Sequence, residues 1–137
     1  MAQEIVIAGG KRTPFGDFGR SLKDIPLSSL ATHAAKATVE AVGVEASDVD
    51  HIVWGNVLPV DPDGFYVGRV AGLNIGMADE SCALQVNRAC GSGTQAIITA
   101  AQQIMTGHGK IALAGGGENF SRGAYVDRKS TRLNSSH

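Results

Sequence analysis

The sequence predicts an α/β protein in which a mostly parallel β-sheet lies between layers of helices. Short apolar, β-branched segments alternate along the chain with longer segments whose apolar residues recur at helical spacing. Loops rich in glycine and proline separate the two kinds of segment. Such alternation is typical of parallel sheets with helical crossovers on both faces, and their sites form beyond the carboxyl ends of the strands.

The first half of the chain contains two predicted strands and two predicted helices. Glu4–Ala8 is a β-branched run closed by two glycines, which predicts a buried strand. Leu27–Val42 is an amphipathic helix, because its apolar residues recur every three or four positions and Gly43 follows as a stop. His51–Leu58 returns to strand character, and a weaker helix is expected over Tyr66–Asn74.

The second half repeats the pattern. Ser81–Val86 is a short apolar strand. Gly91–Thr106 carries apolar residues on more than one face, so we expect a helix that is buried on most sides. Lys110–Ala114 is the last predicted strand and ends in three glycines.

Composition describes an ordinary globular domain. The 137 residues are 43% hydrophobic and 18% charged, with a formal net charge of −1. No field of one sign is available to hold nucleic acid, and no apolar run approaches the roughly 20 residues that span a bilayer. With two cysteines and no leader-like N-terminus, we expect a cytoplasmic protein with neither a nucleic-acid nor a membrane partner.

The chain divides into residues 1–127, expected to form one domain, and a different tail over 128–137. The tail is polar and aperiodic and has no stripe that could pack. It resembles the translation of a sequencing adapter at the end of a truncated gene sequence. We therefore expect the tail to be unstructured and foreign, and the natural chain to be longer.

Cys90 is the candidate catalytic residue. It lies in Asn87–Gly93 (NRACGSG), where a predicted strand passes into a predicted helix. Free N–H groups and the positive dipole end at a helix N-terminus favour the thiolate and can stabilise an oxyanion. The flanking glycines leave room for a substrate beside the sulfur. A lone cysteine is usually a small core residue, and Cys82 is expected to be one.

The cysteines and glycines of this region also allow two other interpretations. Gly91–Ala96 also fits a dinucleotide-binding fingerprint, with Glu118 as the later acid, although that fingerprint belongs on the first strand of a sheet. Cys82 and Cys90 could form a disulfide or a metal pair, but seven intervening residues and no neighbouring histidine give no zinc spacing, so neither pair is expected.

The motif around Cys90 closely resembles the active-site segment of the thiolases, the acetyl-CoA acetyltransferases and 3-ketoacyl-CoA thiolases. Three other segments agree in order: 11–16 (KRTPFG), 54–58 (WGNVL) and 116–121 (GGENFS). The resemblance covers residues 3–126 and implies a layered thiolase-like fold, of which this chain is the N-terminal part. Ala89 departs from it, since a larger residue is common there. A decarboxylating ketoacyl synthase is a rival that the motifs disfavour.

The resemblance implies that Cys90 takes an acyl group from a CoA thioester and passes it to a second thioester or to CoA. This is covalent catalysis in two half-reactions, with coenzyme A as substrate rather than as a tightly bound cofactor. The resemblance also implies an activating histidine and a second cysteine, both in the later half of the family's chain, and a homodimer or homotetramer for the intact enzyme.

No histidine in the sequence is expected to replace the missing base. His108 follows the helix that begins near Cys90, roughly 22 Å away at 1.5 Å per residue. His51 opens a strand at the opposite edge, His33 lies on a polar helix face, and His137 is in the tail. The 137 residues alone are therefore expected to be inactive, and a fragment that only associates with other chains is the alternative. Three arginines that could meet a CoA phosphate are expected to be solvated instead: Arg12, Arg69 and Arg122.

Overall fold

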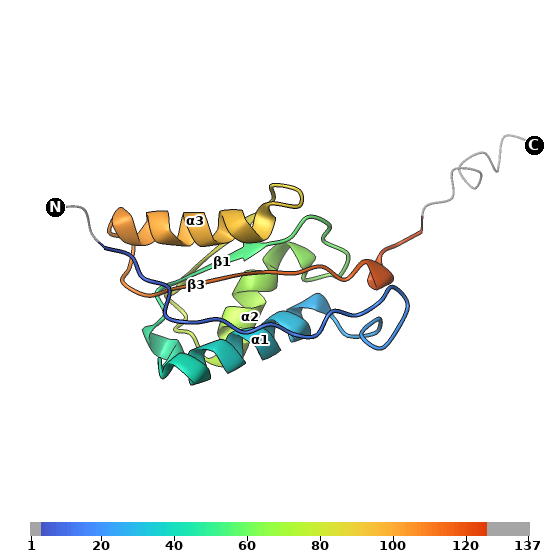
Figure 1. Cartoon of the computed structure of the whole chain (residues 1–137), viewed down its shortest axis with the longest axis horizontal. Helices are drawn as coiled ribbons and strands as arrows, with labels where there is room; N and C mark the ends of the chain where they lie inside the picture. The colour runs from blue at the N-terminus through green and yellow to red at the C-terminus, as the bar shows by residue number, and fades with distance from the viewer. Residues whose placement is uncertain (1–3, 126–137) are drawn as a thin grey trace, which may run out of the picture.

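The computed structural model describes residues 4–125, in which three parallel strands alternate with three helices (Figure 1). The elements are α1 (Leu27–Val42), β1 (His51–Gly55), α2 (Val67–Ile75), β2 (Cys82–Val86), α3 (Ser92–Met105) and β3 (Ala112–Gly116). Short 3₁₀ turns occupy Ala46–Asp48, Gly64–Tyr66 and Phe120–Arg122. The predicted α/β class and the parallel sheet are confirmed.

The sheet has the order β2-β1-β3, and β1 is its centre. All five residues of β1 are buried. His51 stands beside Cys82 on one side and Ala112 on the other, so the three strands start and end level. Their carboxyl ends therefore share one edge of the sheet, where α/β proteins place their sites.

Asp50 fixes how β3 begins beside β1. Its Oδ2 accepts the N–H groups of Lys110 at 2.7 Å and Ile111 at 3.1 Å. Because both bonds favour the charged carboxylate, they lower the pKa of Asp50. The Asp50 backbone also donates to Ile111 and accepts from Cys82, so one residue organises the start of all three strands.

Helices cover both faces of the sheet. α3 packs on one face, while α1 and α2 contact each other and the opposite face (Figure 1). The core therefore has a part on each side of β1. Leu27, Ala31, Trp54, Val67 and Ala71 form one cluster, Val39, Val49, Ile52 and Met77 a second, and Val53, Ala96 and Ala100 the third, beneath α3.

The start of α1 depends on a residue far along the chain. Pro26 precedes the helix and supplies no side-chain cap. Instead Asp61, which is 8% exposed, accepts the N–H of Leu27 through Oδ2 at 3.2 Å and pairs through Oδ1 with Arg122 at 2.5 Å. A carboxylate at a helix N-terminus also interacts favourably with the dipole. At the other end, Gly43 ends the helix with a φ of 70°, as the sequence predicted.

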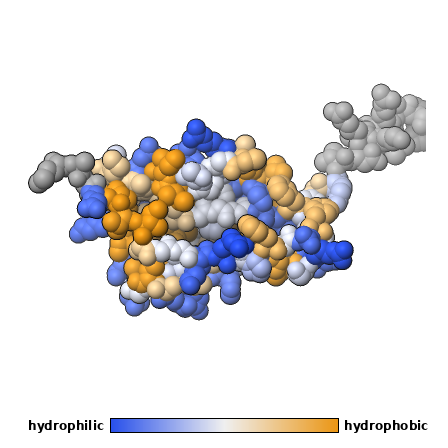
Figure 2. Space-filling model, in the orientation of Figure 1, coloured by the Kyte–Doolittle hydropathy of each residue, from blue (hydrophilic) through white to orange (hydrophobic). Residues whose placement is uncertain are grey.

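The predicted buried strand at Glu4–Ala8 is wrong. The segment is extended but belongs to no sheet, and Val6 and Ile7 are 76% and 79% exposed. The segment has no strand partner, because β1 already has two and a cavity separates the following residues 11–13 from β3, whose outer edge pairs with no strand within residues 4–125. Figure 2 shows apolar side chains gathered near the N-terminal end of the described residues, on the face of the molecule turned to the viewer.

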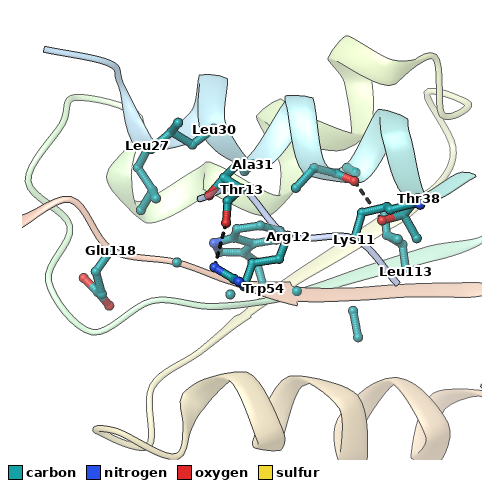
Figure 3. A pocket seen from close by; sticks show the side chains of 16 residues that line it. Lys11, Arg12, Thr13, Leu27, Leu30, Ala31, Thr38, Trp54, Leu113 and Glu118 are labelled. Atoms are coloured by element: carbon teal, nitrogen blue, oxygen red, sulfur yellow. Dashed lines mark hydrogen bonds between the residues drawn. The ribbon is translucent and has the colours of Figure 1, made fainter. Parts of the chain in front are cut away.

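A gap separates the N-terminal segment from β3. The gap is a cavity of about 150 Å³ between residues 11–13, α1 and the strand. Figure 3 shows Leu27 and Ala31 of α1 on one side of it and Trp54 on the other. Arg12 is exposed, as expected, and lies over the ring of Phe15, 4.1 Å from its centre.

The expectation that the third long helix is buried on most sides is also wrong. In α3, only Ser92, Ala96 and Ala100 are buried, whereas Ile97, Ile98 and Met105 are between 43% and 59% exposed. One face of the helix meets the sheet, and nothing in residues 4–125 covers the other. No helix in this part of the chain is long and apolar enough to span a membrane. The tail 128–137 lies outside the described residues.

Candidate functional site

Cys90 lies in the turn that joins β2 to α3, as predicted. Residues 87–91, here called the Cys90 turn, connect the last residue of β2 to the first residue of α3. The turn is closed by backbone bonds from Gly91 N–H to the Arg88 carbonyl at 3.0 Å and from Ser92 N–H to the Ala89 carbonyl at 3.1 Å. The Cys90 thiol is free and exposed. It therefore stands at a helix N-terminus, open to reagents.

A cavity of about 640 Å³ opens beside the thiol at the carboxyl ends of the strands. Residues after all three strands form its walls, so the cavity belongs to the edge where the sequence predicted a site. The lining is mainly apolar and consists of Gly55, Val57, Leu58, Ala89, Cys90, Ser92, Gly93, Ile97, Ala114, Gly115, Gly116, Gly117, Glu118 and Phe120.

Glycine in β1 lets α3 approach the sheet closely. A Cβ added at Gly55 would lie 2.6 Å from the carbonyl carbon and oxygen of Ser92 and 2.9 Å from the nitrogen of Gly93. The first turn of α3 therefore rests directly on the backbone of β1. This contact sets the depth at which Cys90 enters the cavity.

Glu118 is a site residue that the sequence reasoning did not single out for this role. It lines the same cavity, and its carboxylate accepts the N–H groups of Val57 and of Leu58, the latter at 3.3 Å. Asn56, 3% exposed, donates to the Gly117 carbonyl at 3.1 Å. These bonds join the loops after β1 and β3 at the cavity. The sequence did indicate both residues indirectly, because Asn56 lies in the family motif WGNVL and Glu118 in the family motif GGENFS.

No histidine of residues 4–125 lies at the cavity. His51 starts β1 at the far end of the sheet, and its Nε2 has no hydrogen-bond partner in the described part of the chain. Burial, together with the charge of nearby His108, lowers the pKa of His51. His108 itself contacts Thr106 at 2.9 Å, and His33 is exposed on α1. His33, His51 and His108 therefore lie away from the cavity that Cys90 lines.

Cys82 and two arginines differ from expectation. Cys82 is exposed rather than a core residue, because β2 is an edge strand whose first three residues are uncovered. Arg69 donates to the carbonyls of Ser81 at 2.7 Å and Asp79 at 2.8 Å, so it supports the entry to β2. Arg122 is held by its ion pair with Asp61. Residues 4–125 contain no cluster of three or more possible metal ligands.

Comparison with known proteins identifies the family. The family described as "Thiolase, N-terminal domain" matches residues 5–137. The chain belongs to the thiolase family. The resemblance found in the motifs around Cys90 is therefore confirmed over almost the whole chain, and the layered α/β fold agrees with it.

Relatives of this thiolase-family chain include the beta-ketothiolase BktB of Cupriavidus necator, 43% identical over 126 residues, and the human mitochondrial 3-ketoacyl-CoA thiolase, 39% identical over 128 residues. These matches cover 92% and 93% of the chain but 32% of each relative. The chain thus spans about a third of their length.

Solved structures of thiolases share the fold. The human mitochondrial 3-ketoacyl-CoA thiolase in complex with CoA superposes with a TM-score of 0.85 at 40% identity, covering 88% of this chain and 31% of that one. The acetyl-CoA acetyltransferase of Bacillus anthracis gives a TM-score of 0.83 at 32% identity, covering 96% and 33%.

Proposed function

We propose that this chain supplies the nucleophilic half of a thiolase-type acyltransferase, with Cys90 as the residue that carries the acyl group. The observation that carries the proposal is the position of the thiol, exposed at the N-terminus of α3 and beside an apolar cavity at the carboxyl ends of the strands. Membership of the thiolase family supports the same reaction class.

The first half-reaction forms a thioester on the protein. The Cys90 thiolate attacks the carbonyl carbon of an acyl-CoA, the bond from that carbon to the CoA sulfur breaks, and CoA leaves with the proton that the thiol lost. The N–H of Cys90 makes no hydrogen bond within residues 4–125, and it is available to stabilise the oxyanion. The dipole of α3 favours the same negative charge.

The second half-reaction releases the acyl group. A second acyl-CoA loses its α-proton, and the resulting carbanion attacks the Cys90 thioester carbonyl, which forms a carbon–carbon bond and frees the thiolate. In the cleavage direction, the Cys90 thiolate attacks the 3-keto carbon of a 3-ketoacyl-CoA, and the bond between C2 and C3 breaks to release an acyl-CoA carbanion that takes up a proton. CoA then attacks the Cys90 thioester, which forms a second acyl-CoA and frees the thiolate. No histidine of residues 4–125 lies at the cavity, and the Glu118 carboxylate there is engaged by the N–H groups of Val57 and Leu58. The proposed base for these proton transfers is therefore a group from outside these residues.

The proposed ligands are acyl-CoA and CoA, with no tightly bound cofactor. The mainly apolar lining suits an acyl chain, and a structural relative is described as a complex with CoA. The rival dinucleotide fingerprint at Gly91–Ala96 follows β2, an edge strand, and its Ser92, the first residue of α3, is buried. An NADH-induced rise in melting temperature would favour that rival. The cytoplasmic location stays a prediction.

We further propose that the intact protein is a homodimer or homotetramer, as the family resemblance implies. β2 supports this, because Cys82, Ala83 and Leu84 leave an uncharged strand edge exposed, and such edges pair with other chains. Labelling of Cys82 by a maleimide should fall as protein concentration rises through the association range, while Cys90 labelling does not. Equal concentration dependence at both thiols would contradict pairing at this edge.

Acyl-enzyme formation is the direct test. The intact protein is incubated briefly with acetoacetyl-CoA or acetyl-CoA, and intact mass and peptide spectra locate any acetyl group. We expect one acetyl group on Cys90 of the intact protein and none in its Cys90→Ala variant. Cys82→Ala is the matched control and should keep the adduct. An adduct on Cys82 alone, or one that survives in Cys90→Ala, would contradict the proposal. The association-only alternative predicts no adduct at any thiol of the folded chain.

A further inference from the structure

The residue before the nucleophile has an unusual backbone conformation. Ala89 has a φ of 46°, and it is the single non-glycine residue with positive φ in residues 4–125. The left-handed region is unfavourable for residues that carry a Cβ, so such a conformation persists only where the surroundings hold it. Ala89 also lines the cavity next to Cys90. Its conformation determines where the chain places the thiol.

The side chain of Ser92 holds this conformation from the helix side. Its Oγ accepts the N–H of Arg88 at 2.8 Å and donates to the carbonyl of Ala89 at 2.7 Å. A hydroxyl has one proton to donate and two lone pairs, so both bonds form at once. Ser92 is 5% exposed, and water competes little for these bonds.

Ser92 is not acting as a helix cap. A capping side chain accepts N–H groups further along its own helix, whereas the Ser92 hydroxyl bonds backward to the two residues that precede Cys90. Gly91 occupies the N-cap position of α3 and makes no side-chain cap bond. Loss of the hydroxyl should therefore affect the Cys90 turn more than the helix.

Asn87 holds the same turn from the sheet side. Its Oδ1 accepts the N–H of Ala89 at 3.0 Å, and its Nδ2 donates to the carbonyl of Val57 at 3.1 Å. Both peptide groups of Ala89 are thus engaged, one by Asn87 and the other by Ser92. The Cys90 turn is connected through these side chains to the loop after β1 and to the first turn of α3.

We propose that Ser92 is a positioning residue: its hydroxyl keeps Ala89 in the left-handed conformation and so presents the Cys90 thiol at the helix N-terminus and the cavity. This inference deepens the proposed function, on which it rests for its role in acyl transfer. The hydroxyl does not take part in the reaction, since both of its bonds lie within the turn.

The test compares the two exposed cysteines of one chain. Rates of alkylation by iodoacetamide are measured by peptide mass spectrometry for Cys90 and Cys82, and the Cys90 rate is divided by the Cys82 rate. Ser92→Ala should lower this ratio about tenfold, because two ordinary hydrogen bonds to the turn are lost. Thr94→Ala is the matched control: Thr94 is an exposed hydroxyl residue in the same helical turn and makes no side-chain hydrogen bond within residues 4–125.

A rescue separates positioning from a general structural role. Glycine takes positive φ at no steric cost, so the double variant Ser92→Ala with Ala89→Gly should recover most of the lost ratio. If Ser92→Ala fails to fold, the double variant should restore the circular dichroism spectrum as well. A double variant as slow as, or as unfolded as, Ser92→Ala would overturn the proposal. So would an unchanged ratio in Ser92→Ala, or an equal loss in Thr94→Ala.

The outcomes also distinguish this inference from the proposed function. Alkylation requires no CoA thioester, so the ratio tests positioning even when the chain accepts no acetyl group. Where acetylation by acetyl-CoA is seen, we expect Ser92→Ala to slow it at least as much as alkylation, because acyl transfer also needs the oxyanion aligned with the Cys90 N–H. Acetylation that proceeds at the wild-type rate in Ser92→Ala would refute the role in acyl transfer.

Discussion

Replacing Gly55 by alanine should separate α3 from the sheet at the place where Cys90 is held. The added Cβ would lie 2.6 Å from the Ser92 carbonyl, while an ordinary contact begins near 3.4 Å. The helix end must then move by the difference, about 0.8 Å. Both groups in the contact are backbone, so no side chain can rotate away. Overpacking of this kind costs about 1 to 3 kcal/mol of unfolding free energy.

The assay is urea unfolding followed by circular dichroism, together with the rate of Cys90 alkylation. Gly93→Ala is the matched control for stability, because a Cβ there meets nothing within 4 Å. Alanine at Gly93 should leave stability unchanged or raise it by up to about 1 kcal/mol, since glycine is unfavourable in a helix. Gly55→Ala should also slow Cys90 alkylation, because the thiol moves with the helix end.

Two results would refute this reasoning. One is a Gly55→Ala protein as stable as the wild type, which would mean that α3 does not rest on β1. The other is an equal loss of stability in Gly93→Ala, which would mean that the helix end tolerates no Cβ at all. Loss of stability without any change at Cys90 would show that the contact supports the fold but does not position the thiol.

Three further predictions concern single side chains. Asp61→Ala should lower the unfolding free energy by about 1 to 3 kcal/mol in urea, because the buried N–H of Leu27 loses its acceptor and an ion pair is broken; an unchanged midpoint would contradict this. The lowered pKa of His51 means that the unfolded chain binds a proton more readily, so stability should fall as the pH drops below the ordinary value of 6.5, and His51→Gln should remove that part of the loss. The lowered pKa of Asp50 arises instead from bonds that favour its charged form, so this carboxylate adds stability above its ordinary pKa of 3.8. That stability is lost as the pH falls through the folded-state pKa. In Asp50→Asn, the melting temperature should therefore fall less steeply with decreasing pH than in the wild type.

Local pattern predicted the elements that carry their own signals. Helical spacing and Gly43 located α1 at Leu27–Val42, the bounds that the structure shows. β1 and β3 were found within a few residues because short apolar runs there end at proline or glycine, and β2 because a short apolar segment precedes Asn87–Gly93. The same reasoning placed Cys90 between a strand and a helix, since a run of one period gives way to the other at Asn87–Gly93.

The sequence by itself therefore determined the α/β class, the order of the elements from α1 onward and the position of the candidate nucleophile. These follow from periodicity and turn residues, which act over a few neighbours. Only the tertiary structure decided which edges were covered: Glu4–Ala8 has no strand beside it, and Cys82 is exposed because β2 lies at the edge. It also decided the contacts of Glu118 and Ser92 at the site. The bond between Glu118 and Val57 joins residues distant in sequence, and the bond between Ser92 and Ala89 depends on the left-handed conformation of Ala89. Neither kind of bond leaves a periodic pattern in the sequence.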